Sequence, residues 1–402
     1  MKSKYEKDIL PFIKDFDTFI NFILERNPNL TNKTQVIGKN DCFELNSQLY
    51  FQRTAIKASY TQDQYVAIDL FFKLAVKSNL FLMQINSKNK FELMKTVCLE
   101  EFLNLNIYEK YVFLLESFWS KYEFDEELEN DIYEFSEIIY VISRTNFENK
   151  IVKSDVKYCR SLFSYYSKFT KILEIMGICE LEFIDNVKSK YDDSIKSIMP
   201  TACGTEICKV LINKTLDYLN TEIYYIDMIK ERWKIKDVKV KKTFIEYISK
   251  VFEPKLIEKT INSNVQINRK GTYILKVSLD KNLWRIVKLS HNTKLHKLHL
   301  IIQEAFDFDN DHMYSFYTGT SYRNRKEFYC ANPLGESNEY EDLTVEDAEI
   351  YKGQKFMYLF DFGDMWKFEI QVIDFVENEE TDLLPQIIES KGKSPEQYNE
   401  VW

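Results

Sequence analysis

Glycine is scarce in this chain, with 9 glycines among 402 residues. The P-loop, the dinucleotide-binding pattern GxGxxG and the hydrolase pattern GxSxG are all missing, and so is the zinc-protease pattern HExxH. The first three need glycine where the backbone turns tightly or approaches a phosphate or an oxyanion. Their absence weighs against nucleotide-driven and serine-hydrolase chemistry, and we expect no cofactor.

Long apolar runs are missing as well. No segment approaches the roughly 20 apolar residues that cross a bilayer, and no apolar segment follows the basic start of the chain as in a secretory signal. The seven cysteines are scattered and odd in number, which is typical of reduced thiols. These features predict a cytoplasmic protein without membrane contact.

What the chain has instead is length, apolar content and an uneven charge. Its 402 residues are 45% hydrophobic, which predicts two or three domains. From residue 271 onward it holds 14 Lys and Arg against 24 Asp and Glu, which leaves 40 basic and 39 acidic residues in the part before. An acidic last third is better suited to basic protein surfaces or cations than to phosphates.

Residues 1–265 carry mostly helical patterns. The first, with Pro11 near its start, has apolar residues at helical spacing up to Ile23. A helical stretch at 62–77 then leads into strand-like segments at 80–84 and 91–97, which is the order of a winged helix. A weaker form of that order follows. We therefore predict three domains: a winged-helix-like domain at 1–145, a second one at 146–265, and an α+β domain at 266–402.

Lysines mark two candidate nucleic-acid contacts in the helical part. Lys88 and Lys90 lie at the tip of the first hairpin, and a denser basic cluster with Trp233 includes Lys234, Lys239 and Lys241. A stripe of cations beside a stacking Trp is one way to bind phosphates and bases. The near-neutral charge of the surrounding part favours the alternative, a solvated helix face with Trp233 turned inward.

Beyond residue 271 the pattern changes to strands. Two β-type runs at 273–279 and 283–289 form a hairpin, and a helix capped by Thr293 follows with Leu295, Leu298 and Ile302 on one face. More strand-like segments come after it. This order predicts a mixed or antiparallel sheet with one main helix across it.

The segment Leu359-Phe360-Asp361-Phe362-Gly363-Asp364-Met365-Trp366 joins two of these strands by a turn rich in carboxylates and aromatics. Other landmarks are Leu283-Trp284-Arg285-Ile286, His296-Lys297-Leu298-His299, Asp311-His312-Met313-Tyr314, and a tail with Pro385, Gly392 and Gln397-Tyr398. On these landmarks, residues 272–374 and the tail to about 398 resemble the plasmid pRi ORF-three-like domain family, also catalogued as an insertion-element passenger protein family. The resemblance implies an α+β fold and a setting near mobile DNA, and it supplies no reaction.

The resemblance also implies histidine positions that this chain has partly lost. The family pattern has a second histidine where Tyr314 stands and another where Phe368 stands, while His312 keeps the first position. His299, His312, Asp361 and Asp364 remain as candidates for acid–base chemistry, and the last three of them as weak candidates for metal ligands. Losing imidazole ligands lowers metal affinity, so we expect no metal. The alternative role of Asp361 and Gly363 is to build the turn, with the carboxylate bonding backbone N–H groups and glycine supplying a positive φ.

Three hypotheses of function follow. The sequence favours a non-enzymatic binding or adaptor protein, in which the helical part docks nucleic acid or protein and the acidic domain binds a protein or peptide through an aromatic groove. The groove residues would be Trp284, His312, Phe316, Phe362 and Trp366. The second hypothesis is an enzyme or metal-binding protein that uses the His and Asp candidates, and the third is a DNA-binding protein.

Overall fold

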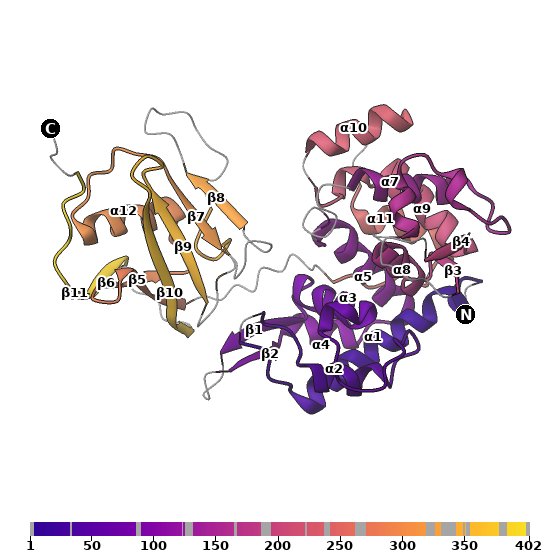
Figure 1. Cartoon of the computed structure of the whole chain (residues 1–402), viewed down its shortest axis with the longest axis horizontal. Helices are drawn as coiled ribbons and strands as arrows, with labels where there is room; N and C mark the ends of the chain where they lie inside the picture. Colours follow the sequence, from indigo (N-terminus) through magenta and orange to yellow (C-terminus); the bar gives the residue numbers. More distant parts are fainter. Residues whose placement is uncertain are drawn as a thin grey trace. The chain divides into compact units, whose positions relative to one another are not determined.

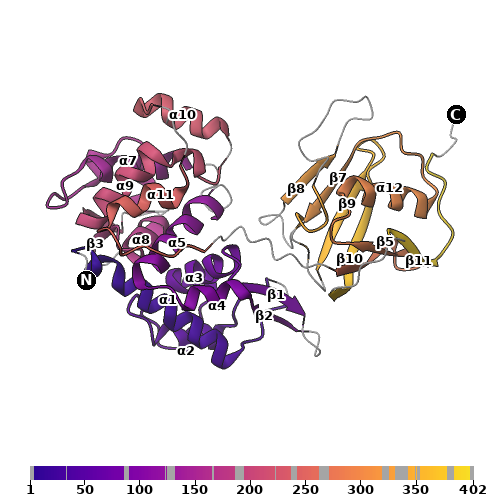
Figure 2. The ribbon, with the colours of Figure 1, turned by 180° about the vertical axis from the view of Figure 1, so that it is seen from behind.

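The chain divides into two compact units, Met1–Leu82 with Glu92–Asn264, and Met83–Phe91 with Val265–Trp402. Figures 1 and 2 show the first as mostly helical and the second as a sheet with one long helix. The structure is a computed structural model. It describes residues 4–32, 34–85, 90–122, 124, 132–164, 167–185, 194–221, 223–236, 242–261, 271–318, 326–330, 343–348, 350, 354–377 and 384–398.

The described helices of the first unit confirm that the N-terminal part is mainly helical. They are α1 (Glu6–Arg26), α2 (Lys39–Asn46), α3 (Val66–Lys77), α4 (Val97–Leu103), α5 (Ile107–Lys121), α7 (Ile132–Arg144), α8 (Ser167–Ile175), α9 (Ala202–Lys214), α10 (Ile223–Trp233) and α11 (Phe244–Ile248). Two hairpins lie in the same part of the sequence: β1 (Phe81–Ile85) with β2 (Phe91–Lys95), of which Met83–Phe91 is assigned to the second unit, and β3 (Cys179–Phe183) with β4 (Ile195–Pro200). The winged-helix assignment and the division of 1–265 into two domains stay predictions.

Aromatic rings fill the core of the first unit. Helix α1 begins at Glu6, before the predicted start, and contains Pro11 inside it. Its Phe12 and Phe16 have no exposed surface, and their rings lie 6.0 and 5.6 Å from Phe71 of α3, measured between centroids. Edge-on and tilted ring pairs of this kind stabilise a core beyond the area they bury.

The described strands from residue 271 onward form one antiparallel sheet, which is one of the two arrangements that the strand patterns left open. Its strands lie in the order β11-β6-β5-β10-β9-β7-β8, and every pairing is antiparallel. Their bounds are β5 (Gly271–Asp280), β6 (Leu283–Ser290), β7 (Tyr314–Thr318), β8 (Lys326–Cys330), β9 (Lys355–Phe360), β10 (Trp366–Glu377) and β11 (Gln386–Lys391).

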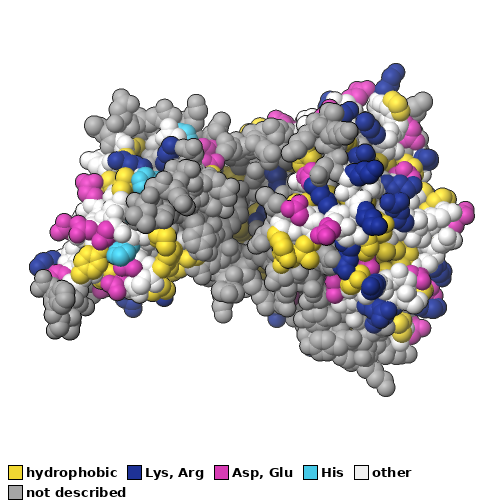
Figure 3. All heavy atoms as spheres, turned by 90° about the horizontal axis from the view of Figure 1, so that it is seen from above, with side chains coloured by type: hydrophobic (Ala, Val, Ile, Leu, Met, Phe, Trp, Pro, Cys, Tyr) yellow, Lys and Arg dark blue, Asp and Glu magenta, His cyan; other side chains and the backbone are white. Residues whose placement is uncertain are grey.

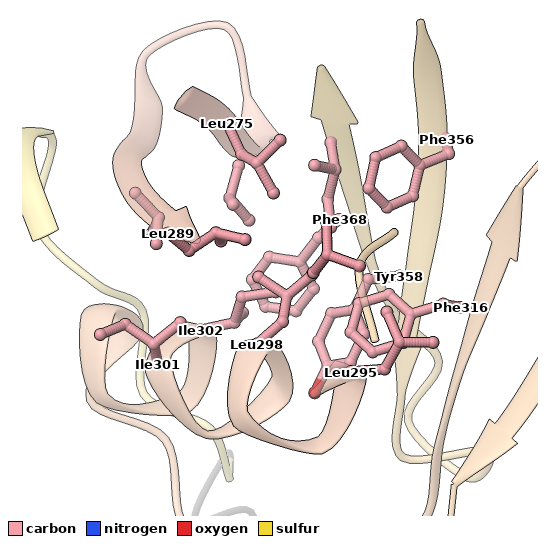
Figure 4. Close-up of a cluster of buried hydrophobic side chains, with 14 of the residues drawn as sticks. Leu275, Leu289, Leu295, Leu298, Ile301, Ile302, Phe316, Phe356, Tyr358 and Phe368 are labelled. Atoms are coloured by element: carbon pink, nitrogen blue, oxygen red, sulfur yellow. The ribbon is translucent and has the colours of Figure 1, made fainter. Parts of the chain in front are cut away.

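Helix α12 (Leu295–Phe306) covers one face of this sheet. Figure 4 shows Leu298 and Ile302 of the helix pointing at Tyr358 and Phe368 of the strands, and all four are fully buried. Because side chains alternate along a strand, the even-numbered residues of β9, and those of β10 up to Val372, face the helix. A register shift between Val372 and Asp374 reverses this alternation, and Phe375 packs on Tyr273 of the core. The sheet therefore has a packed face and an opposite face.

Candidate functional site

The turn between β9 and β10 is built by a carboxylate. Oδ1 of Asp361 accepts hydrogen bonds from the backbone N–H groups of Gly363 at 2.8 Å and Asp364 at 3.3 Å. This agrees with the turn interpretation of Asp361. The predicted role of the glycine is wrong, because the positive φ angles of the turn belong to Asp361 (54°) and Met365 (57°), and Gly363 is not among the positive-φ residues.

His312 lies beside this turn. Its Nε2 is 3.4 Å from Oδ2 of Asp361 and 3.8 Å from Oδ1 of Asp311. The hydroxyl of Tyr398, in the C-terminal tail, donates to the Asp311 carboxylate at 2.6 Å. The neighbouring Gln397 accepts from the backbone N–H of Asp309 at 2.5 Å. The tail is thus fixed against the segment that leads into β7, and His312 stands between two carboxylates.

His299 points the other way, into the core. Its ring stacks on Tyr314 with 3.6 Å between centroids, Nδ1 lies 2.6 Å from the Tyr358 hydroxyl, and Nε2 lies 2.5 Å from the Asn310 carboxamide oxygen. Burial lowers the pKa of His299 to about 3, because a charged imidazole loses its hydration there. A neutral ring with both nitrogens engaged and no exposed surface is a core histidine.

The four acid–base candidates therefore do not converge. His312 and Asp361 are neighbours, and His299 faces the packed interior. Asp364 is exposed, and its backbone N–H donates to the Asp361 carboxylate at the turn. Within the described part of the chain, no group of three or more His, Cys, Asp or Glu side chains could hold a metal ion.

The residues at the two positions where the resemblance implied histidines belong to the core. Tyr314 is 3% exposed and Phe368 fully buried. The Tyr314 hydroxyl lies 2.8 Å from Nδ1 of His296, and the Tyr314 ring covers His299. Tyr314 thus helps to make the surroundings of His299 packed interior.

The predicted aromatic residues do not form one groove. Phe316 has no exposed surface, and Trp366 packs its half-buried ring edge-on against Phe308 at 4.9 Å. Trp284 pairs with Ser278 and Lys391 on the opposite face of the sheet, with the Lys276 ammonium 4.7 Å from its ring centre. Phe362, 36% exposed, reaches the surface at the turn, and so does His312, whose side chain is 41% exposed.

Two exposed methionines stand beside Phe362, and sequence reasoning missed both. Met313 and Met365 are each 44% exposed. The backbone carbonyl of Met313 accepts from Asp361 N–H at 3.0 Å, and Met365 N–H donates to the Asp361 carbonyl at 2.7 Å. We call Met313, Phe362 and Met365 the apolar corner. The place of Met365 in the turn was visible in the sequence, but the pairing of β7 with β9 that brings Met313 beside it was not.

The lysine candidates lie elsewhere. Lys88, Lys239 and Lys241 are outside the described residues. Lys90 precedes β2 and Lys234 follows α10, and both are exposed. Trp233 stacks on Tyr140 of α7 with 4.3 Å between ring centres, which agrees with the interpretation that its ring is turned inward.

The family comparison bears on the second unit. Residues 271–400 match the family model described as plasmid pRiA4b ORF-3-like protein. This confirms the family resemblance, and we call this part the ORF-3-like unit. A crystal structure titled as a protein of unknown function from Methanosarcina mazei Go1 is similar at 20% identity, covering 31% of this chain and 72% of that one, with a TM-score of 0.26. None of the curated proteins matches the chain.

In the described residues, no helix has the length and apolar content needed to span a membrane.

Proposed function

We propose that this protein is a binding or adaptor protein, and that its ORF-3-like unit binds a basic, partly apolar segment of a protein partner at the apolar corner. The observation that carries the proposal is the exposure of three large apolar side chains at residues whose backbone lies at one turn or is hydrogen-bonded to it. Methionine and aromatic residues are enriched in interface cores. Methionine is also flexible enough to adapt to different partners.

Carboxylates lie within four residues of the apolar corner in the sequence. Asp309, Asp311 and Asp364 are exposed, and the whole unit is acidic. Figure 3 shows hydrophobic side chains beside acidic ones on the face of this unit that it displays. An apolar centre with an acidic rim complements a segment in which apolar residues alternate with Lys or Arg, since the charges steer the encounter and the apolar groups give affinity.

The helical unit supports the adaptor role by its layout. Helix α3 runs into the β1–β2 hairpin, and α8 into the β3–β4 hairpin, which leads on to α9. We propose that these are two winged-helix-like modules that dock a nucleic acid or a protein. The order of elements supports this proposal, and winged helices serve in both kinds of docking.

A random-peptide selection against the full chain tests the apolar corner. We expect the selected peptides to be rich in Lys or Arg and in large apolar residues. Their affinity should fall about tenfold or more in a variant with Met313→Ser, Phe362→Ser and Met365→Ser, in line with the loss of an interface centre. Ile56→Ser, which changes a 97% exposed isoleucine of the helical unit, is the control and should leave binding unchanged. Peptides that bind the triple variant as well as the unchanged protein would refute the proposal.

A further inference from the structure

A hollow of about 690 Å³ lies in the first unit, where three helices meet. The start of α1, the end of α7 and the start of α9 form its wall. Its volume falls in the range of about 300–1,000 Å³ that is common for small-molecule sites. None of the residues singled out by sequence lies in it.

The wall of this hollow is cationic. Lys4, Lys7, Arg144 and Lys209 line it, against one carboxylate, that of Glu206. Glu206 is already engaged, because its Oε1 accepts from Lys209 Nζ at 2.6 Å. The wall therefore keeps an excess of positive charge, and four cations on three elements face one small space. Figure 3 shows Lys and Arg side chains gathered on the face of this unit that it displays.

A buried hydroxyl on the same wall has no partner. Thr205 lines the hollow and is 7% exposed, and no hydrogen bond satisfies its Oγ1. A helical threonine can bond the carbonyl one turn back, and Thr215, the C-cap residue of α9, does so, with its Oγ1 3.2 Å from the Leu211 carbonyl oxygen. A buried hydroxyl without a partner is unfavourable, so Thr205 stands where a ligand oxygen would satisfy its hydroxyl.

Side chains, not helix amides, would recognise the ligand. In the first turn of α9, Cys203 N–H already donates to Asp8 Oδ2 at 3.3 Å, and Gly204 N–H donates to Thr201 Oγ1 at 2.8 Å. Ammonium and guanidinium groups with a hydroxyl suit the several oxygens of a phosphate. Phe147, 46% exposed at the same hollow, offers a ring on which a base can stack.

We propose that this hollow binds the phosphate group of a nucleotide. Lys7 and Arg144 hold its charge, Thr205 donates to one of its oxygens, and Phe147 contacts the base. The phosphate comes either from a free mononucleotide or from the 5′ end of a single strand, and both present the same chemistry. The inference concerns the first unit and does not rest on the apolar corner.

Calorimetric titration of the full chain with AMP, adenosine, inorganic phosphate and a 5′-phosphorylated oligoadenylate tests the proposal. We expect AMP or the oligonucleotide to bind, phosphate to bind more weakly, and adenosine not to bind. Binding by AMP identifies a mononucleotide site, and binding by the oligonucleotide alone identifies a strand end. If neither binds, or if polyglutamate binds as tightly, the proposal is overturned.

Three variants locate the binding. Lys7→Gln and Arg144→Gln should each weaken it about tenfold or more, the usual effect of removing a charged hydrogen-bond donor. Lys14→Gln is the matched control, since Lys14 is exposed on the same face of α1, two turns or about 10 Å further along the helix, and should change affinity less than twofold. An equal loss in Lys14→Gln would show unspecific attraction and overturn the site.

Thr205→Val separates a ligand contact from a structural role. The substitution keeps the shape and removes the unsatisfied hydroxyl, so the free protein should melt at the same or a higher temperature. Affinity for the phosphate ligand should nevertheless fall severalfold. If the variant melts lower and binds normally, the hydroxyl serves the fold and not the ligand.

Discussion

The two units use buried charge differently to tie distant segments together. In the first unit, Asp69 of α3 is 3% exposed and lies 2.9 Å from Lys168 of α8 and 3.0 Å from Lys73. In the ORF-3-like unit, the buried tie is a cation, Arg285, which donates to the carbonyl oxygens of Ala305 at 2.6 Å and Lys391 at 2.9 Å. One unit depends on a carboxylate, and the other on a guanidinium.

This difference matters because a carboxylate titrates in acid and a guanidinium does not. The ORF-3-like unit also contains His299, whose pKa is lowered to about 3. The two units should therefore lose stability over different ranges of falling pH, His299 acting first and Asp69 later. The following predictions test this comparison, and hydrogen exchange assigns each effect to its unit.

The largest effect is expected for Gly204→Ala. A Cβ at this position of α9 would lie 1.9 Å from the backbone oxygen of Ile178, so the first unit should lose about 4 kcal/mol although alanine favours helix. The matched change Gly363→Ala meets its nearest atom, Asp361 Oδ1, at 3.1 Å, and should cost about 1 kcal/mol or less. Urea unfolding measures both, and equal losses would contradict the close packing.

Asp69→Ala should destabilise the first unit by about 3 kcal/mol, because it leaves the lysines and Gln62 without their acceptor. The neighbouring lysines hold the pKa of Asp69 down to about 2. The stabilisation is therefore present above the unfolded pKa and lost as pH falls from about 4 towards 2. Comparing acid unfolding of the unchanged protein and Asp69→Asn checks this. Glu182→Gln, which breaks an exposed pair with Lys196, is the control and should matter less.

Arg285→Met should cost the ORF-3-like unit about 3 kcal/mol, because buried carbonyl oxygens lose their donors. Besides its two long-range carbonyl partners, the guanidinium donates to Ser394 Oγ at 2.9 Å. A lysine ammonium group cannot make this forked set of hydrogen bonds, so Arg285→Lys should keep only a minor part of the stabilisation. Lys288→Met on the same strand is the control. Faster exchange confined to β11 and α12 is the expected signature, and faster exchange in the helical unit would argue against it.

His299→Gln should remove a pH dependence. The folded pKa of about 3 lies below the ordinary value of 6.5, so the unfolded chain binds more protons and stability falls as pH drops below about 6.5. Between pH 7 and 5 the unchanged ORF-3-like unit should lose about 2 kcal/mol from this residue. The variant should be less stable at pH 7 but flat across the interval. Urea unfolding midpoints of both proteins at pH 7 and pH 5 test this. An equal loss of stability in both would show that His299 is not the cause of the pH dependence.

Local pattern predicted much of the ORF-3-like unit. The runs at 273–279 and 283–289 became β5 and β6, nearly to the residue, because alternation and a short turn fix a hairpin. Strand β11 was not predicted. Its sequence does not alternate, and its register with β6 shifts between Ile387 and Glu389, so its pairing depends on the rest of the sheet. The predicted N-cap of α12, Thr293, was also wrong. The N-cap is Lys294, whose side chain makes no capping hydrogen bond.

The candidate site was less predictable, because its geometry depends on distant strands. His296 and His299 are three residues apart on one helix, yet His296 is exposed and His299 buried. Tyr314 and Tyr358, from β7 and β9, decide that difference. The turn role of Asp361 could be predicted from the sequence, because its carboxylate bonds N–H groups that are close to it in the chain. The sequence carried no signal for the cationic hollow, whose wall comes from residues about 200 positions apart.

The ties to the tail have a consequence during translation. Arg285 is synthesised about a hundred residues before its acceptors at Lys391 and Ser394. The loop at Asp309–Asp311 is likewise synthesised before its partners Gln397 and Tyr398. Until β11 has emerged from the ribosome, the β6 edge of the sheet therefore has no partner strand. We expect this unit to reach protease resistance only once residue 398 has left the exit tunnel.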